Sequence, residues 1–299
     1  MIVNQLVRGR VGLGPVAVVR RPILRNLRMR TSVVKAKLAR NEPVLAVTVH
    51  FTDPSVAELA SLLGFDCLWL DLEHHATSLE TASNLIRASR VGNADVVARP
   101  AKGEFMRMGR LLETGAAGIR YPRCESAAEA AEVVKWAKFA PLGRRGVDGG
   151  NPDMPYLTMP VADYLKAANE QTFIVMQLED SEAVARADEI AAVPGIDVLF
   201  LGVGDFTVLS GFPGRFDHPA VDDAVRRVAS AAAKAGIHWG MPCFSPEHGR
   251  RLIDLGARFL AHSADLSILK KGLEQIRVDF APLGCRFAPA CNGPGSVTV

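Results

Sequence analysis

Short apolar runs rich in β-branched residues alternate with amphipathic segments along the chain from residue 42 onward. The runs predict eight strands, at 44–49, 67–71, 94–99, 117–121, 173–178, 196–202, 237–241 and 258–262. Segments with helical periodicity lie between them, including 54–63, 78–90, 104–114, 126–138, 181–192 and 218–235. This alternation is typical of βα units that build a parallel sheet.

The number of βα units predicts an α/β fold of one domain. Eightfold alternation over about 240 residues fits a closed (β/α)8 TIM barrel better than an open doubly wound sheet. The glycine-rich segment 202–205 follows a strand but lacks GxGxxG spacing, so little favours a dinucleotide-binding fold. We expect a basic, flexible N-terminal extension over 1–30, the barrel over 31–278 and a flexible C-terminal tail over 279–299.

Composition and charge exclude several other classes of protein. With 48% hydrophobic and 22% charged residues, the chain is neither disordered nor collagen-like. No apolar run reaches the roughly 18 to 20 residues that a membrane span needs. Residues 1–40 hold 10 of the 35 Lys and Arg and no acid, which leaves 25 basic and 32 acidic residues, a net charge of −7, for residues 41–299. The acidic body argues against nucleic acid as a partner.

The cellular location follows from the basic extension and the cysteines. Residues 1–30 are rich in arginine and free of acid, like an organelle transit segment, but they lack serine. We expect a solvated extension, with organelle targeting as the alternative. The five cysteines are odd in number and lack CxxC spacing, which is typical of a reducing compartment. The cytoplasm is therefore the expected location.

Polar or ionisable residues follow most of the predicted strands at their carboxyl ends, where (β/α)8 enzymes build their active sites. A strand that is buried on both faces has no structural need for a charge there, because an unpaired buried charge is costly. Any single one of these residues could be a loop or cap residue, but together they predict an active site. They are His50, Asp71, Glu73, His74, His75, Arg99, Arg120, Gln177, Glu179, Asp205, Cys243 and His262.

Two carboxylates in this set indicate a cation. Glu179 and Asp205 follow consecutive predicted strands, and close carboxylates repel unless a proton or a cation lies between them. An all-oxygen pair suits Mg²⁺ or Mn²⁺, with Co²⁺ or Zn²⁺ as alternatives. None of the eight strand segments contains lysine, so a Schiff-base mechanism lacks its nucleophile. Carbonyl chemistry would then use the metal as a Lewis acid.

The second and third strand ends add a candidate base and a fixed positive charge. His74 lies three residues after Asp71, and a carboxylate beside an imidazole can fix its tautomer and raise its basicity. The same DLEHH cluster could be a zinc site, although HExxH spacing is absent and Cys67 lies inside the strand. Arg99 precedes Pro100, which forces an extended backbone and keeps the guanidinium at the barrel mouth. A charge there suits an oxo acid whose enolate must be stabilised.

Six motifs occur in order along the chain: DCLWLDLEHH (66–75), VVARP (96–100), GAAGIRYP (115–122), FAPLGRRGV (139–147), QLED (177–180) and FLGVGDFT (200–207). Together they resemble the HpcH/HpaI aldolase family of class II, metal-dependent pyruvate aldolases. One short motif would be weak, but six in order are specific, and the likeness runs over residues 34–277. The resemblance implies a barrel of the phosphoenolpyruvate/pyruvate type.

The resemblance also implies roles for particular residues. Glu179 and Asp205 would bind the divalent cation, and Gln177 would line the same pocket. The backbone N–H groups of Gly204 and Asp205 would hold the substrate carboxylate.

On the other side of the pocket, the resemblance assigns the acid/base and the enolate partner. His74, oriented by Asp71, would be the acid/base, and Arg99 would stabilise the enolate. Residues 242–244 occupy the region that contacts the aldehyde half in relatives.

The implied reaction is reversible aldol cleavage of a 4-hydroxy-2-oxo acid to pyruvate, or a close 2-oxo acid, and an aldehyde. A CoA-ester lyase of the citrate-lyase β type is an alternative, although no clear CoA-binding surface is recognisable. A non-catalytic oxo-acid-binding barrel is disfavoured because base, arginine and metal ligands are present together. The segment 267–277 is short and leads into a tail rich in Pro, Gly and Cys, so we expect it to pack on another copy. Relatives form trimers that pair into hexamers, which implies a homo-oligomer here.

Overall fold

The computed structural model describes residues 28–287, whose eight parallel strands form one closed barrel in sequence order, with β8 paired to β1. The predicted α/β (β/α)8 TIM barrel is confirmed. Of the expected extension over 1–30 and the expected tail over 279–299, residues 1–27 and 288–299 lie outside the described residues. Within the expected tail, residues 279–283 are helical, so helix continues beyond the predicted boundary at 278. The strands are β1 (Val44–Val49), β2 (Cys67–Asp71), β3 (Asp95–Arg99), β4 (Gly118–Tyr121), β5 (Phe173–Leu178), β6 (Val198–Leu201), β7 (His238–Pro242) and β8 (Phe259–Ala264).

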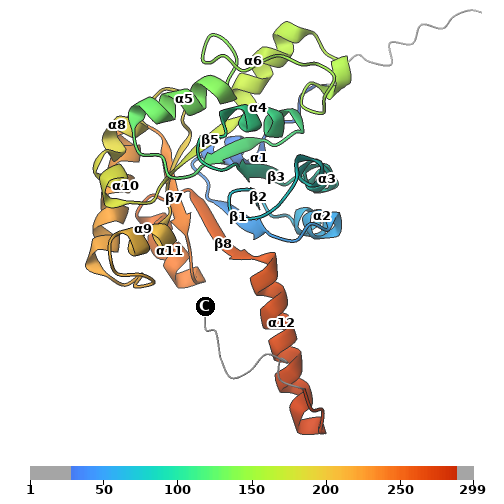
Figure 1. The fold of residues 1–299 in the computed structure, drawn as a ribbon, viewed down its shortest axis with the longest axis vertical. Helices are drawn as coiled ribbons and strands as arrows, with labels where there is room; N and C mark the ends of the chain where they lie inside the picture. The colour runs from blue at the N-terminus through green and yellow to red at the C-terminus, as the bar shows by residue number, and fades with distance from the viewer. Residues whose placement is uncertain (1–27, 288–299) are drawn as a thin grey trace, which may run out of the picture.

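Helices surround the barrel in Figure 1. They are α1 (Val33–Ala39), α2 (Pro54–Leu62), α3 (Leu79–Ser89), α4 (Phe105–Glu113), α5 (Ala127–Ala137), α6 (Val161–Gln171), α7 (Ser181–Ala185), α8 (Ala187–Ala191), α9 (Val203–Leu209), α10 (Pro219–Ala235), α11 (Pro246–Asp254) and α12 (Asp265–Phe280), with 3-10 turns at Pro155–Leu157 and Ala281–Leu283. The segment predicted as one helix over 181–192 is two, because the backbone of Arg186 leaves helical geometry between α7 and α8. Within residues 28–287, no helix has the length and apolar character needed to cross a membrane.

The core has two layers because successive side chains on a strand point to opposite faces. Residues such as Ala46, Val175 and Phe200 belong to the cluster inside the barrel. Their strand neighbours, such as Val47 and Met176, belong to a larger cluster that packs under the surrounding helices. Both faces of the strands are therefore largely buried, which explains the near-continuous apolar runs in the sequence.

The amino-terminal end of the barrel is closed by α1. Val34 and Leu38 of this helix are buried in the interior cluster. The buried carboxylate of Asp95 accepts hydrogen bonds from the Ser32 hydroxyl at 2.6 Å and from the Val34 N–H at 2.9 Å. Asp95 thus ties α1 to the start of β3, and the opposite end of the barrel remains for function.

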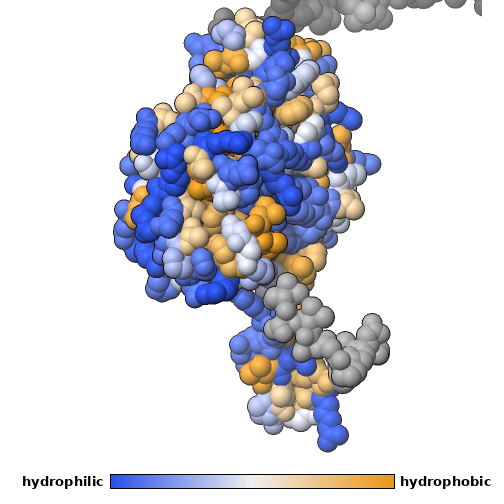
Figure 2. Space-filling model, turned by 60° about the vertical axis from the view of Figure 1, so that its left-hand side comes forward, coloured by the Kyte–Doolittle hydropathy of each residue, from blue (hydrophilic) through white to orange (hydrophobic). Residues whose placement is uncertain are grey.

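The last helix, α12, stands away from the barrel (Figure 1), and none of its residues is buried. It starts at Asp265, whose carboxylate accepts hydrogen bonds from the backbone N–H groups of His50 and Phe51. Five exposed apolar residues follow a 3,4,3,4 spacing along it, which places them on one face: Leu266, Leu269, Leu273, Ile276 and Phe280. Apolar surface is visible on this projecting part of the molecule in Figure 2. The expected segment 267–277 is thus the middle of a longer helix.

Candidate active site

A buried ion pair joins the ends of β2 and β3. The Arg99 guanidinium donates from Nε to Asp71 Oδ1 at 3.0 Å and from Nη2 to Asp71 Oδ2 at 2.6 Å. Its Nη1 lies 3.1 Å from Oε2 of Glu73. Burial alone would raise the pKa of Asp71, but the Arg99 guanidinium outweighs it and holds that pKa below its ordinary value. Arg99 is therefore fixed at the barrel mouth by two carboxylates.

Two histidines follow this pair, and the structure places them differently. The His74 side chain is half exposed, with Nε2 3.5 Å from Oε2 of Glu73, and its backbone N–H donates weakly to Asp71. The His75 Nε2 lies 3.9 Å from Oδ2 of Asp71, and its ring centroid is 4.3 Å from that of His50. The expected pairing of the Asp71 carboxylate with the His74 imidazole is therefore not formed in this arrangement, where the nearer imidazole is that of His75.

A buried arginine packs against two aromatic rings and orients a polar residue of the site. The fully buried guanidinium of Arg120 lies 3.5 Å from the ring centroid of Trp69 and 3.7 Å from that of Phe200. Its Nε donates to Oε1 of Gln177, and the Gln177 amide donates to Oε1 of Glu179. Gln177 is thus oriented by Arg120, and its amide N–H points to the candidate metal ligand.

Glu179 follows β5 and is only 1% exposed. Its Oε2 accepts the backbone N–H of Arg123 at 2.8 Å. Burial raises the pKa of Glu179 to about 7, and the nearby carboxylates of Asp205 and Glu73 act in the same direction. Gly202 is required beside it, because a Cβ atom there would come within 2.6 Å of Glu179 Oε1. Within residues 28–287 no basic side chain forms an ion pair with Glu179, so hydrogen bonds from Gln177 and from the Arg123 backbone hold its carboxylate.

Asp205 lies in the first turn of α9, four residues after β6. Its carboxylate is 34% exposed and lies 3.6 Å from Nη2 of Arg123. The first backbone hydrogen bond of the helix is from Phe206 to Gly202, so the N–H groups of Gly204 and Asp205 precede the helical ladder. The glycine-rich segment 202–205 is therefore the start of α9.

The donor set fits a hard divalent cation. Glu179 and Asp205 offer carboxylate oxygens, and Asp205 adds to the rise that burial causes in the pKa of Glu179. No group of three His, Cys, Asp or Glu side chains within residues 28–287 is arranged to hold a metal ion. Water and substrate would have to complete the coordination of an ion held by two carboxylates, as Mg²⁺ and Mn²⁺ allow.

Two residues of the site have no assigned role in the sequence-based prediction. Glu73 was among the strand-end residues, but its contacts with both Arg99 and Arg123 depend on how three strand ends meet. Arg123 follows Pro122 at the end of β4. A basic residue directly after a proline at a strand end was the feature of the sequence that could have marked it as a site residue. Together they connect Asp71, through Arg99, to Asp205.

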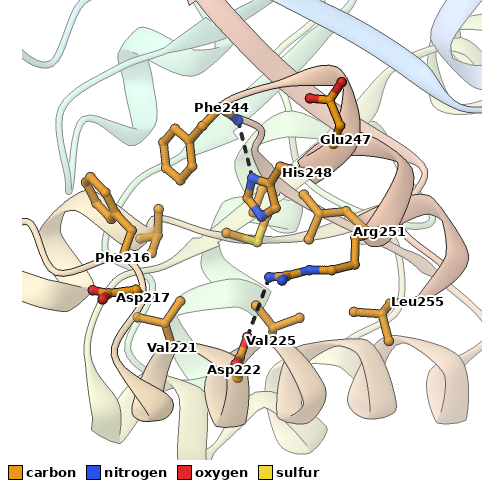
Figure 3. A pocket seen from close by; sticks show the side chains of 13 residues that line it. Phe216, Asp217, Val221, Asp222, Val225, Phe244, Glu247, His248, Arg251 and Leu255 are labelled. Carbon is orange, nitrogen blue, oxygen red and sulfur yellow. Dashed lines mark hydrogen bonds and ion pairs between the residues drawn. The ribbon is translucent and has the colours of Figure 1, made fainter.

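Another hollow lies outside this site. A cavity of about 540 Å³ is bounded by α10, α11 and the loop after β7 (Figure 3). Phe216, Phe244 and His248 form an aromatic stack on one side, and Arg251 lies 3.8 Å from Asp222 on the other. Phe244, expected near the aldehyde half of the substrate, thus lines a cavity between outer helices, and none of Arg99, Glu179 and Asp205 lines it.

A closed parallel barrel with ionisable residues at the carboxyl ends of its strands defines a (β/α)8 enzyme whose chemistry lies at the mouth. A family model described as "HpcH/HpaI aldolase/citrate lyase" matches residues 47–271. The chain belongs to this family, which confirms the resemblance found in the motifs.

Named relatives agree with this assignment. A hydroxypyruvate/pyruvate aldolase from Pseudomonas aeruginosa is 33% identical over 267 residues, which cover 88% of this chain and 96% of the relative. A 4-hydroxy-2-oxo-heptane-1,7-dioate aldolase from Shigella sonnei is 28% identical, over 85% of this chain and 97% of the relative. The crystal structure of an HpcH/HpaI aldolase from Desulfitobacterium hafniense superposes with a TM-score of 0.78 at 27% identity, over 84% of this chain and 97% of that one.

Proposed function

We propose that the protein is a divalent-metal-dependent carbon–carbon lyase that reversibly cleaves a 4-hydroxy-2-oxo acid to pyruvate, or a close 2-oxo acid, and an aldehyde. Similarity to aldolases that act on hydroxypyruvate, pyruvate and a 4-hydroxy-2-oxo dioate supports this class of substrate. The observation that carries the proposal is the continuous line of ion pairs across the mouth, Asp71–Arg99–Glu73–Arg123–Asp205. It supports a site in which the buried Arg99 and the carboxylate of Asp205 share one opening, and Glu179 adjoins this line through the backbone N–H of Arg123.

Glu179 and Asp205 would hold the cation, Mg²⁺ or Mn²⁺, which when bound supplies a Lewis acid for the 2-oxo group. Gln177 and the N–H groups of Gly204 and Asp205 would orient the substrate carboxylate. The positive charge of Arg99 would stabilise the enolate that remains after the carbon–carbon bond breaks. Because two carboxylates fix Arg99 before substrate arrives, this charge needs no reorganisation during the reaction.

The acid/base would be His74, which removes the proton from the C4 hydroxyl as the bond breaks. Its imidazole is half exposed, with Nε2 3.5 Å from the carboxylate of Glu73. His75 is the competing candidate, because its imidazole is closer to Asp71. Variants of both residues separate the two assignments, as set out in the Discussion.

An assay over a panel of 4-hydroxy-2-oxo acids tests the proposal. We expect aldehyde release that requires Mg²⁺ or Mn²⁺ and stops in EDTA. Glu179→Ala and Asp205→Ala should abolish turnover and keep the fold, because removing one of two facing carboxylates relieves repulsion. Full activity in EDTA, or an unchanged rate in Glu179→Ala, would contradict a class II mechanism.

Two other functions make different predictions. A CoA-ester lyase of the citrate-lyase β type would release a CoA thioester and would leave simple hydroxy-oxo acids intact. A non-catalytic binding barrel would bind the oxo acid without turnover. The relatives at 33% identity are named aldolases, which favours aldol cleavage over thioester cleavage.

We also propose a homo-oligomer, a trimer or hexamer, in which α12 packs on another copy. The apolar face of α12 is exposed along its whole length, and a solvated helix with such a stripe is unusual. Asp265 fixes the start of this helix to the end of β1. A copy that covers α12 would thus also abut the barrel mouth.

For the location we propose the cytoplasm. The four described cysteines, Cys67, Cys124, Cys243 and Cys285, are unpaired in the structure, as a reducing compartment would keep them. Fractionation of cells that express the full chain, with and without residues 1–30, tests this location against organelle targeting.

A further inference from the structure

Arg123 contacts the two candidate metal ligands and a third carboxylate, Glu73, beside them. Its Nη2 lies 3.6 Å from Oδ1 of Asp205, and its Nε lies 3.8 Å from Oε1 of Glu73. Its backbone N–H donates to Glu179 at 2.8 Å. The guanidinium therefore supplies positive charge where the family's cation would be needed, and the backbone of the same residue holds the more buried ligand.

The backbone at this position is fixed by its neighbours. Arg123 has a φ of 49°, in the left-handed region that residues other than glycine rarely adopt. The N–H of Cys124 donates to the carbonyl of Gln177 at 2.9 Å, and Lys102 Nζ donates to the carbonyl of Arg123 at 2.8 Å. These bonds hold the Arg123 backbone against Glu179 whatever its side chain does.

The side chain, in contrast, is free to leave. The Arg123 side chain is 42% exposed, and neither of its two ion pairs is shorter than 3.6 Å. Long pairs made by an exposed guanidinium are weak, each worth up to about fivefold in an equilibrium constant. A divalent cation bound by Asp205 would repel the guanidinium and would take over one of its partners. The two cations therefore cannot both keep their full interaction with Asp205.

We propose that Arg123 is a positioning residue that acts as a built-in counter-cation: its guanidinium pairs with Asp205 and Glu73 before the metal binds and competes with the divalent ion for Asp205. Arg123 thus weakens metal binding and sets the affinity through electrostatic competition. The proposal rests on the proposed function, in which Glu179 and Asp205 bind the ion. Removing both ion pairs together should tighten the binding of the ion by about tenfold.

Isothermal titration of the metal-free full-length protein with Mn²⁺, without substrate and at fixed ionic strength, tests the competition. Arg123→Gln removes the charge and keeps the backbone N–H to Glu179, and Arg123→Lys keeps the charge. Arg227→Gln is the matched control, because Arg227 is 40% exposed and pairs 2.9 Å from Asp188, itself 37% exposed, on the outer helices. It changes the net charge equally, away from the mouth. Asp205→Asn identifies the site.

We expect Mn²⁺ to bind Arg123→Gln about tenfold more tightly than wild type, and Arg123→Lys and Arg227→Gln within about twofold of wild type. An unchanged or weaker affinity in Arg123→Gln, while wild type binds Mn²⁺ and Asp205→Asn does not, would overturn the role of Arg123 and leave the proposed function standing. Tightening in Arg123→Lys equal to that in Arg123→Gln would also overturn it, because charge would not be the cause. Absence of Mn²⁺ binding in every variant would overturn both proposals.

Discussion

The buried carboxyl of Glu179 should make the stability of the metal-free protein fall as the pH rises. Burial, with Asp205 and Glu73 nearby, raises the pKa of this group to about 7 from an ordinary value near 4.5. Between these two pH values the folded protein keeps a proton that the unfolded chain has lost. Stability then decreases with pH, because the unfolded state binds fewer protons than the folded state. The loss begins near pH 4.5 and is complete once the pH exceeds about 7.

The magnitude follows from the difference between the two pKa values. One pKa unit corresponds to about 1.4 kcal/mol, so the whole change costs about 3 kcal/mol. About 2 to 3 kcal/mol of this falls between pH 5 and pH 8. Glu179 is 1% exposed, so solvent screening does not reduce it greatly. That is a large share of the 5 to 15 kcal/mol by which domains are usually stable.

Urea denaturation in EDTA at pH 5, 6, 7 and 8 measures this effect, with Glu179→Gln as the variant that cannot ionise. Its amide turns an N–H towards a neighbouring donor, Gln177 or the Arg123 backbone, at a cost that is the same at every pH. The pH dependence is therefore compared, and not the absolute stability. We expect the advantage of wild type over Glu179→Gln to shrink by about 2 to 3 kcal/mol from pH 5 to pH 8. Parallel profiles for the two proteins would refute the reasoning.

Three further outcomes are expected. His74→Ala should slow cleavage by about 10² to 10⁴ while His75→Ala stays active, and the reverse result in the same cleavage assay would assign the base to the imidazole nearer Asp71. Arg99→Ala should lower the free energy of unfolding by about 3 kcal/mol in urea titrations, because it leaves the buried carboxylate of Asp71 without its partner; a stability equal to wild type would show that this pair is not needed. The exposed substitution Leu273→Glu on α12 should reduce the mass measured by light scattering without unfolding the barrel; a wild-type protein that is monomeric at micromolar concentration would rule out an interface there.

The fold was predictable because its signal is local and repeated. Each strand is largely buried on both faces, so each reads as an apolar run, and β1, β2 and β5 begin and end at the predicted residues. Helix α9 is not among the predicted helical segments, because its start coincides with the glycines of the segment 202–205. Glycine at position 202 leaves room for the Glu179 side chain, and the same glycine-rich stretch makes the start of the helix hard to recognise in the sequence.

The sequence predicts which residues form the site better than it predicts the contacts between them. Strand ends identify Asp71 and Arg99, but sequence spacing alone favours His74 over His75 as the partner of Asp71, since it does not show which side chain turns inward. The sequence shows a basic residue after Pro122, but it does not show the left-handed backbone that determines where the Arg123 side chain lies. Contacts that cross from one strand end to another are set by the closed barrel, not by neighbours in the chain.

The central claim is that the barrel mouth stabilises the enolate of pyruvate with a divalent cation and Arg99. Exchange of solvent deuterium into the methyl group of pyruvate, followed by proton NMR in D2O, tests this step without needing the natural aldehyde. We expect exchange that requires Mg²⁺ or Mn²⁺, stops in EDTA and is lost in Arg99→Ala, because the enolate is common to exchange and cleavage. Exchange that continues unchanged in EDTA, or no exchange above background with either metal, would contradict the claim.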